Sequence, residues 1–539
     1  MGVPPPSRVE SGTARILASM RRWALIAWLL VASLSIAACS APAAGSTRIA
    51  RILTGTPSTL DPAAQGDAGS AAITAQLFES LTALDASGTT QPALAACWQV
   101  EDGGKRIVFH LRPDLAFSDG SPLRATDVVR SWLRIVDPKA PSPLASLMMD
   151  VAGAREYASG QSADPQAVGL HADDTTGDVT VDLTRPAAEF VDVVAGPTFG
   201  VVPPGVGVQT SALQPGPAFV GSGGYVLSDA TSQKLTLQAN PHYWAGRPAI
   251  ATIELIEDIG GKSPVDVFQA GDLDYTQIGS YDASWIAYDK TLGPQLLAVP
   301  SLSVAYYGFD VRQAPFDDVR VRQAFGMAID WRRIAALTST AGDTVATSMV
   351  PPGIPGRSDR DFVPAHDPVA ARALLAAAGY PGGAGFPAVT LMTGGGAADA
   401  AILADLKREL GITLGYETMG DGYFARLGTN PPEMWSLGWV ADYPGRNDFL
   451  GILLGTGSSA DYGHYSSAEF DAAIAAAGAA TTDAAADAAY DRAEEIVQRD
   501  VPVVPLSYGS GWALSRAGLL GAGQNGQGIL HMAGLAWAN

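Results

Sequence analysis

Short stretches in which apolar and polar residues alternate recur along the chain and predict β-strands. They lie at residues 48–54, 107–111, 179–183, 225–227, 234–238, 253–256 and 503–508, the fourth and fifth forming a predicted hairpin. Apolar residues three or four positions apart predict helices at residues 71–84, 127–136, 265–270, 319–337 and 483–497. Thr126 is suited to cap the second helix, and the Asp317-Asp318 pair suits the start of the fourth. Because strands and helices mix without a fixed repeat period, the pattern predicts an α/β chain of several lobes.

The N-terminal segment follows a different pattern. Two arginines, Arg21 and Arg22, precede an apolar run at residues 23–34, and small residues then lead to Cys39. A basic, an apolar and a small-residue region in this order are typical of a secretory signal. The apolar run is shorter than the stretch of about 20 residues that a membrane-spanning helix needs. The segment therefore predicts export from the cytoplasm.

Residues 36–39, which read Ile-Ala-Ala-Cys, resemble the bacterial lipobox, whose cysteine becomes the acylated first residue of the mature protein. We expect a signal peptide over residues 1–38, with Met20 as the true start, and a tether over residues 39–45 that is lipidated at Cys39. The alternative is an ordinary secretory signal that happens to contain a cysteine.

Composition narrows the class of protein. With 539 residues, of which 47% are hydrophobic, the chain is long enough for two or three packed lobes. A formal net charge of −20 would repel phosphate backbones, which disfavours nucleic-acid binding. The second cysteine, Cys97, stands between alanine and tryptophan, and we expect it to be unpaired and buried as a small apolar side chain.

The sequence lacks motifs for catalysis or metal binding. Its six histidines are widely separated, and none belongs to an HExxH motif or a cysteine–histidine cluster. The stretch Gly260-Gly261-Lys262-Ser263 lacks the first glycine of a phosphate-binding loop, and no G-x-S-x-G nucleophile elbow occurs. We therefore predict no catalytic residue, no metal site and no cofactor.

Six segments, taken in order, resemble the family of extracytoplasmic peptide- and nickel-binding proteins of ABC importers. The longest, at residues 109–129, contains FHLRP, FSDGSPL and DVV and is similar to the family's long signature. The others are LDP at 60–62, GSGGY at 221–225 with NPHYW at 240–244, PFDD to AID at 315–330, GWVADYP at 438–444, and a C-terminal helix and strand from 470 to 506. The chain departs from the family pattern at Gly224, where a proline is usual, and at residues 445–448, where relatives usually carry Asp-Pro.

The resemblance implies an α/β fold of the type II (cluster C) periplasmic-binding-protein class, with two hinged lobes and an extra domain inserted in the first lobe. The first lobe would comprise residues 46–80, 203–303 and 506–539, the extra domain residues 81–202, and the second lobe residues 304–505. Solute would bind between the lobes, which would close over it by a hinge motion. No chemistry would be done on the solute, so we expect the protein not to be an enzyme.

The resemblance also assigns binding residues at 439–442, because relatives that take peptides pair the aspartate of this motif with the ligand's α-ammonium group. An ionised carboxylate shut in a cleft is costly unless it is paired, and a charge-assisted bond to an ammonium group is short and strong. Asp442 would then bind the amino terminus of a peptide, and Trp439 and Val440 would wall it. The alternatives are that Asp442 is a turn residue before Pro444 and that Trp439 packs in the core.

Three further positions are candidates. The stretch Gly66-Asp67-Ala68 falls where relatives offer backbone groups to the peptide main chain, a strand-addition mode that tolerates different side chains. Tyr508 would lie at the border between the lobes. Arg446 could meet a ligand carboxylate or could neutralise Asp442, and the second outcome would undercut the ammonium role.

We therefore expect a lipid-anchored extracytoplasmic protein, on the cell surface or in the periplasm, that binds a short peptide and delivers it to the permease subunits of an ABC importer. We expect it to act as a monomer that does not bind nucleic acid. The alternatives are capture of a nickel chelate or an oligosaccharide on the same fold, a secreted hydrolase on a related scaffold, and a sensory or adhesion lipoprotein that feeds no transporter.

Overall fold

The computed structural model describes residues 1–2, 48–85, 88–206, 215–216, 218–338, 343–420, 422–458, 460–480 and 482–538. The predicted signal peptide, the lipid site at Cys39 and the tether lie outside the described residues. None of the described helices is long and apolar enough to cross a membrane.

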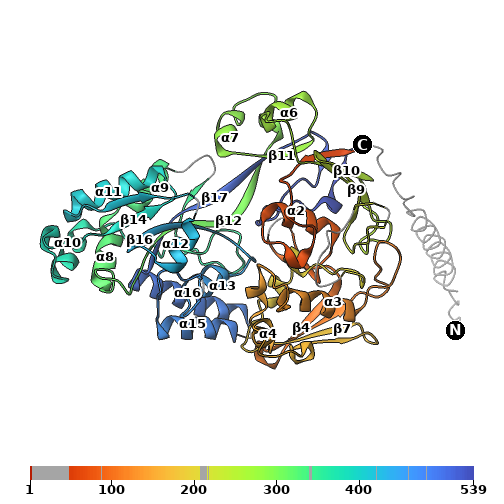
Figure 1. Cartoon of the computed structure of the whole chain (residues 1–539), viewed down its shortest axis with the longest axis horizontal. Coiled ribbons are helices and arrows are strands. Elements are labelled where there is room, and N and C mark those ends of the chain that lie inside the picture. The colour runs from red at the N-terminus through yellow and green to blue at the C-terminus, as the bar shows by residue number, and fades with distance from the viewer. Residues whose placement is uncertain are drawn as a thin grey trace. The chain divides into compact units, whose positions relative to one another are not determined.

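An eleven-stranded mixed sheet organises most of the described chain (Figure 1), in the order β15-β14-β16-β12-β17-β11-β1-β10-β9-β8 with β13 paired to β17. Its strands are β1 (Ala50–Leu53), β8 (Tyr225–Ala230), β9 (Lys234–Ala239), β10 (Thr252–Ile256), β11 (Tyr275–Ile278), β12 (Leu296–Phe309), β13 (Thr344–Val345), β14 (Thr390–Thr393), β15 (Gly415–Thr418), β16 (Met434–Val440) and β17 (Val503–Ser515). The long strands β12 and β17 pair antiparallel and connect the β1 side of the sheet to the β16 side.

Helices and several 3-10 turns surround the sheets. In the described part of the chain the helices are α2 (Ala68–Leu77), α3 (Ala125–Leu133), α4 (Ala154–Ala158), α5 (Phe190–Val193), α6 (Pro264–Ala270), α7 (Ser280–Ile286), α8 (Val319–Ala328), α9 (Trp331–Thr338), α10 (Pro368–Ala377), α11 (Ala397–Leu410), α12 (Tyr423–Thr429), α13 (Arg446–Phe449), α14 (Gly451–Leu454), α15 (Ala468–Gly478) and α16 (Asp483–Asp500). The mixed α/β class predicted from the sequence is confirmed.

A second, four-stranded sheet has the order β4-β5-β7-β6. Its strands are β4 (Ala95–Glu101), β5 (Arg106–Leu111), β6 (Leu170–Asp173) and β7 (Asp178–Asp182), and the small pairs β2 (Thr82–Leu84) with β3 (Thr90–Pro92) and β18 (Leu519–Leu520) with β19 (Ala536–Trp537) lie outside both sheets. Trp132 is fully buried beneath this sheet, and its ring meets Phe109, Phe190 and Phe199 edge-on. Such edge-to-face contacts add to the free energy gained by burying the rings.

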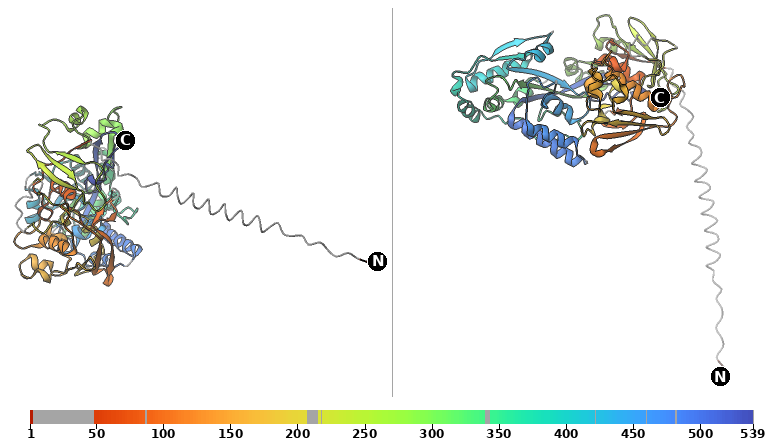
Figure 2. Two further views of the ribbon diagram at one scale, coloured as in Figure 1. Left: turned by 90° about the vertical axis from the view of Figure 1, so that its right-hand side faces the viewer. Right: turned by 60° about the horizontal axis from the view of Figure 1, so that its bottom comes forward.

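The four-stranded sheet lies beside α15 and α16, as both Figure 1 and Figure 2 show. At this junction a Cβ added to Gly104 would lie 3.3 Å from the carbonyl oxygen of Gly478. The close backbone approach leaves little room for a larger residue at Gly104, which also has a positive φ of 90°.

The ends of α2 differ from the predicted helix limits, in part because a side chain caps the helix. The helix predicted at residues 71–84 is α2, which starts earlier because the Asp67 carboxylate accepts from the Ser70 N–H. It ends at Leu77 because Phe78 is extended, and residues 82–84 form β2 instead.

Two further helices are corrected. Thr126 does not cap α3, because the Asp127 carboxylate accepts from the Arg124 N–H at 3.0 Å and the Thr126 hydroxyl bonds to Asp174. The helix predicted at 319–337 is interrupted at Ile329, whose backbone is extended, so that α8 and α9 are separate.

Cys97 is exposed on β4 and not buried as predicted. The pairing of β4 with β5 shifts register between Ala95 and Cys97, which is the effect of a β-bulge. Because no strand was predicted at 95–101, the neighbouring alanine and tryptophan gave no indication of the face that Cys97 takes on β4.

Candidate ligand-binding cleft

A cleft of about 890 Å³ is walled by segments that are far apart in the sequence. On the β1 side of the sheet, the parallel strands β1 and β10 end there and β11 continues past them. The loop leading into α2, the stretch 196–198, the end of β16 at 440–442 and the C-terminal stretch 524–532 complete much of the lining. Its volume falls in the range of about 300–1,000 Å³ that is usual for sites of small molecules.

The stretch Gly66-Asp67-Ala68 lines the cleft, as do Val440 and Asp442. The Asp67 carboxylate is engaged locally, because Ser58 and Ser70 donate hydrogen bonds to it and thereby lower its pKa. Gly66 packs against Pro143, whose Cβ would lie 2.8 Å from a Cβ added at the glycine. The backbone of this loop is therefore fixed at the cleft wall.

Asp442 is held in the wall by its own backbone. Its carbonyl oxygen accepts from the Gln527 side-chain amide at 2.7 Å, and its N–H donates to the Asp448 carboxylate at 3.2 Å. Gln527 is distant from β16 in sequence, and Asp448 lies beyond the turn that follows β16. The stretch 440–442 therefore cannot move without breaking both hydrogen bonds. Burial raises the pKa of the Asp442 carboxyl above its usual range.

Asp448 lies behind Asp442 and is fully buried. One carboxylate oxygen accepts from the Trp439 indole N–H at 2.9 Å, and the other has no hydrogen-bond partner among the described residues. Burial and the charge of Asp442 together raise the pKa of Asp448 well above its usual range. Among the described residues that line the cleft there is no basic side chain to offset the charge of these two carboxyl groups.

Trp439 does not line the cleft. Its ring packs against the apolar core that contains Tyr306, Trp435 and Tyr508, and its indole N–H holds Asp448. The structure therefore places Trp439 one layer behind the wall, where it supports the Asp442–Asp448 pair.

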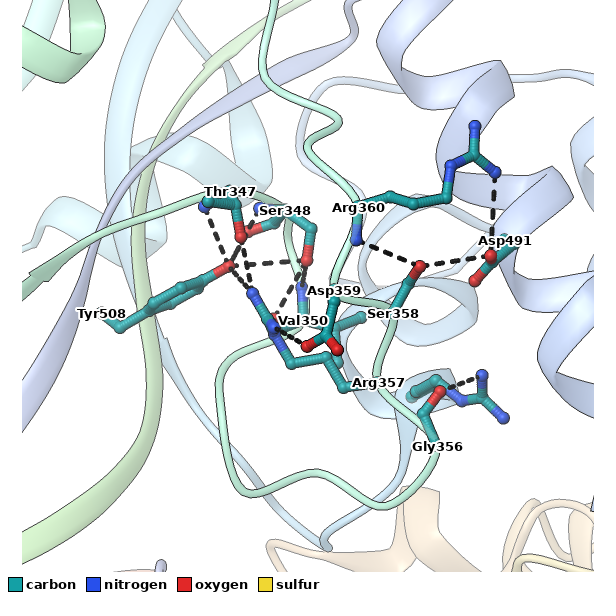
Figure 3. A network of polar contacts seen from close by, with 11 residues as sticks. Thr347, Ser348, Val350, Gly356, Arg357, Ser358, Asp359, Arg360, Asp491 and Tyr508 are labelled. Atoms are coloured by element: carbon teal, nitrogen blue, oxygen red, sulfur yellow. Dashed lines mark hydrogen bonds and ion pairs between the residues drawn. The ribbon is translucent and has the colours of Figure 1, made fainter.

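Tyr508 also lies outside the lining, and its hydroxyl is occupied (Figure 3). It accepts from the Ser348 N–H at 2.9 Å and from the Arg357 guanidinium at 3.2 Å, and it donates to the Ser348 carbonyl at 2.9 Å. Figure 3 shows the hydroxyl pointing into the loop at residues 347–360. Tyr508 fixes this loop.

Arg446 is buried at the start of α13 and does not line the cleft. Its guanidinium donates to the Gly356 carbonyl at 2.6 Å, pairs with Asp487 and lies over the Tyr490 ring. It therefore neutralises Asp487 and not Asp442, and the acidic character of the cleft wall is preserved.

Four residues of this region were not predicted from the sequence. Glu257 and Tyr275 line the cleft at the β10–β1–β11 edge, Gln527 holds Asp442, and Asp448 stands behind it. Glu257 could have been found from the sequence, because it is an acidic residue directly after the strand predicted at 253–256. No local signal marked Gln527.

All three charged residues among the described lining, Asp67, Glu257 and Asp442, are acidic. Among the described residues there is no group of three or more histidine, cysteine, aspartate or glutamate side chains placed to hold a metal ion. The arrangement favours a small molecule that carries positive charge.

Several buried carboxyl groups make the stability of the ligand-free protein depend on pH. Burial raises the pKa of Asp461 and of Glu494 to about 7 and that of Asp192 to about 6. The pKa values of these three carboxyl groups are higher in the folded than in the unfolded state, so the folded state binds more protons. The stability that this proton binding adds at low pH is lost as the pH rises through 6 to 7. We expect the Tm in thermal scans to fall by a few degrees between pH 5.5 and pH 8.

The Glu494→Gln variant provides the control for this prediction. It removes one of the groups with a raised pKa, so its Tm should change less across the same pH range than that of the unchanged protein. A Tm that rises with pH would contradict the prediction.

Comparison with known proteins places this geometry in context. A family model described as "Bacterial extracellular solute-binding proteins, family 5 Middle" matches residues 89–461. The chain is 31% identical to the "Probable deoxycholate-binding periplasmic protein YgiS" of Escherichia coli K12, over 84% of this chain and 86% of that protein. It is 28% identical to the periplasmic oligopeptide-binding protein OppA of the same organism, over 81% of this chain and 82% of that protein.

A solved structure supports the same assignment. The Escherichia coli murein tripeptide binding protein MppA superposes with a TM-score of 0.73 and 25% identity, over 91% of this chain and 98% of that chain. The two-lobed α/β fold expected from the sequence is thereby confirmed. The residue limits predicted for the lobes and for the extra domain stay predictions.

Proposed function

Because this chain belongs to family 5 of the bacterial extracellular solute-binding proteins, we propose that the solute it binds is a short peptide with a free amino terminus. Members of the family are non-enzymatic receptors that bind a solute outside the cytoplasm for an ABC importer, and this chain has that role. The identity of the solute is the part that is proposed.

The Asp442–Asp448 pair is the observation that carries the proposal. Asp442 stands in the cleft wall, and the buried Asp448 behind it has one oxygen without a partner in the described part of the chain. Burial raises the pKa of Asp442, and burial together with the charge of Asp442 raises that of Asp448, an effect that an incoming cation would reverse. A peptide α-ammonium group supplies one positive charge and three N–H donors, so it suits this position.

The rest of the wall suits a peptide backbone. The loop Gly66-Asp67-Ala68 lines the cleft, and we propose that its main-chain groups bond to the ligand. An extended ligand that bonds to such groups gains affinity without reading its side chains. This mode would accept peptides of varied sequence.

Two further parts of the proposal concern delivery. We propose that Cys39 carries a lipid that tethers the protein to the membrane, as its lipobox-like context indicates. The loaded form would then dock on the permease subunits of the importer.

A bile-acid-like ligand is the competing solute, because a relative with 31% identity is named for deoxycholate. Deoxycholate carries a carboxylate, and the charged residues among the described lining of this cleft are all acidic. The resulting repulsion between like charges favours the peptide.

Native mass spectrometry and calorimetry test the proposal together. We expect a peptide to co-purify with the protein, and a short peptide with a free amino terminus to bind at least about tenfold more tightly than its N-acetylated form, since one charge-assisted bond is lost. Recovery of a bile acid, a sugar or a metal chelate without a peptide would contradict it, as would equal affinity for the two peptide forms.

A further inference from the structure

We propose that Glu257 and Tyr275 form a second subsite in the cleft, which binds the cationic side chain of a lysine or arginine in the peptide. The inference rests on the proposed function, since it requires a peptide in the cleft. It assigns the ligand to the class of basic peptides.

The sheet brings these two residues to one edge. β1 lies between β10 and β11, and Ile52 of β1 pairs with Leu255 on one side and with Tyr275 on the other. Leu255 and Tyr275 therefore lie at one level on the same face of the parallel strands. Glu257 follows Leu255 by two positions, so the alternation of the strand directs it to that face as well.

The backbone at this edge is fixed on both sides of Glu257. The Thr54 N–H donates to the Ile256 carbonyl at 2.9 Å, and the Glu257 N–H donates to the Gln233 carbonyl at 2.8 Å. Glu257 and Tyr275 both line the cleft. Tyr275 thus lies on β11, and Glu257 directly follows the end of β10 with its backbone bonded.

Both residues carry a buried polar atom without a partner. Tyr275 is 1% exposed, and within the described part of the chain its hydroxyl makes no hydrogen bond. The same holds for one carboxylate oxygen of Glu257. Buried polar groups are normally satisfied, so two orphan oxygens at one edge of a cleft indicate that a ligand supplies the missing donors.

The chemistry of the two groups selects a cation. A carboxylate only accepts hydrogen bonds, and a phenol oxygen can accept one while its ring attracts positive charge. No basic side chain stands among the described residues lining the cleft to satisfy Glu257. The third acid of the lining, Asp67, is already bonded to Ser58 and Ser70, which leaves Glu257 as the acid available to a ligand on this side of the cleft.

A positional scan tests the subsite. Calorimetry on the whole protein would compare trialanine with its three single-lysine variants, each paired with a norleucine counterpart of nearly the same length but without charge. We expect one lysine position to bind at least about tenfold more tightly than its norleucine counterpart, as a charge-assisted bond would give. The Glu257→Gln variant should reduce that ratio to about one, and Tyr275→Phe should reduce it partly.

Glu254→Gln provides the matched control, because Glu254 lies on β10 three positions before Glu257, pairs with Lys234 and does not line the cleft. It should leave the lysine preference unchanged. A ratio near one at every position, or a preference that survives Glu257→Gln, would overturn the subsite. If trialanine binds and shows no lysine preference, the subsite alone is wrong, whereas a cleft that binds none of the peptides overturns the proposed function too.

Discussion

Replacing Asp442 with asparagine is expected to weaken the binding of a short peptide by at least about 2 kcal/mol, roughly a 30-fold rise in Kd. Asparagine keeps the shape of the side chain and the backbone bonds to Gln527 and Asp448. It removes the negative charge that would meet the peptide ammonium group, and the neutral amide cannot replace that charge. Calorimetry with one peptide in its free and N-acetylated forms measures the effect.

The variant should also lose the ability to distinguish the two forms. The N-acetylated peptide has no ammonium group, so its Kd should change little when Asp442 is replaced. Asp461→Asn is the matched control, because Asp461 is a buried carboxyl group that does not line the cleft. An unchanged Kd for the free peptide in Asp442→Asn would assign Asp442 to the turn before Pro444.

Strand alternation was a sound guide to the fold because it depends on a local geometry that the rest of the protein seldom changes. The predicted hairpin at 225–238 is β8 and β9, and the last predicted strand is the start of β17. Helix ends were less predictable. Ile329 suits the apolar stripe of a helix but is extended in the structure, and Asp405, which accepts from the Asp330 N–H at 3.3 Å, is distant in sequence.

The site was predictable only where a motif and the cleft coincide. Asp442 and the loop at Gly66 both line the cleft, and both came from the family resemblance. Trp439 precedes Asp442 by only three positions, yet strand alternation turns its ring to the core. The position of Arg446 is set by its ion pair with Asp487 of α16. Glu257 becomes a candidate binding residue only because its edge of the sheet forms the cleft. Such facts follow from tertiary contacts and not from local sequence.

The LDP motif at residues 60–62 has a structural explanation that leads to a second large effect. Asp61 is 2% exposed and forms a two-pronged ion pair with the buried Arg134, of which one bond measures 3.1 Å. The same carboxylate accepts from the Ala63 N–H at 3.0 Å, at the start of the 3-10 turn Pro62–Ala64. Arg134 begins the turn that follows α3, so the pair ties the segment before α2 to the four-stranded sheet region.

Asp61→Asn is expected to lower the free energy of unfolding by about 3–5 kcal/mol in urea denaturation, because it leaves the Arg134 guanidinium buried without a counter-charge. Asparagine can still accept from the Ala63 N–H, so the loss reports the ion pair. The double variant Asp61→Asn with Arg134→Met should recover most of the lost stability, since it removes the orphan charge. Glu469→Gln breaks exposed pairs with Arg492 and Arg499 and should leave stability nearly unchanged. If Asp61→Asn is as mild as Glu469→Gln, or if the double variant is the least stable of all, the buried pair does not hold these two regions together.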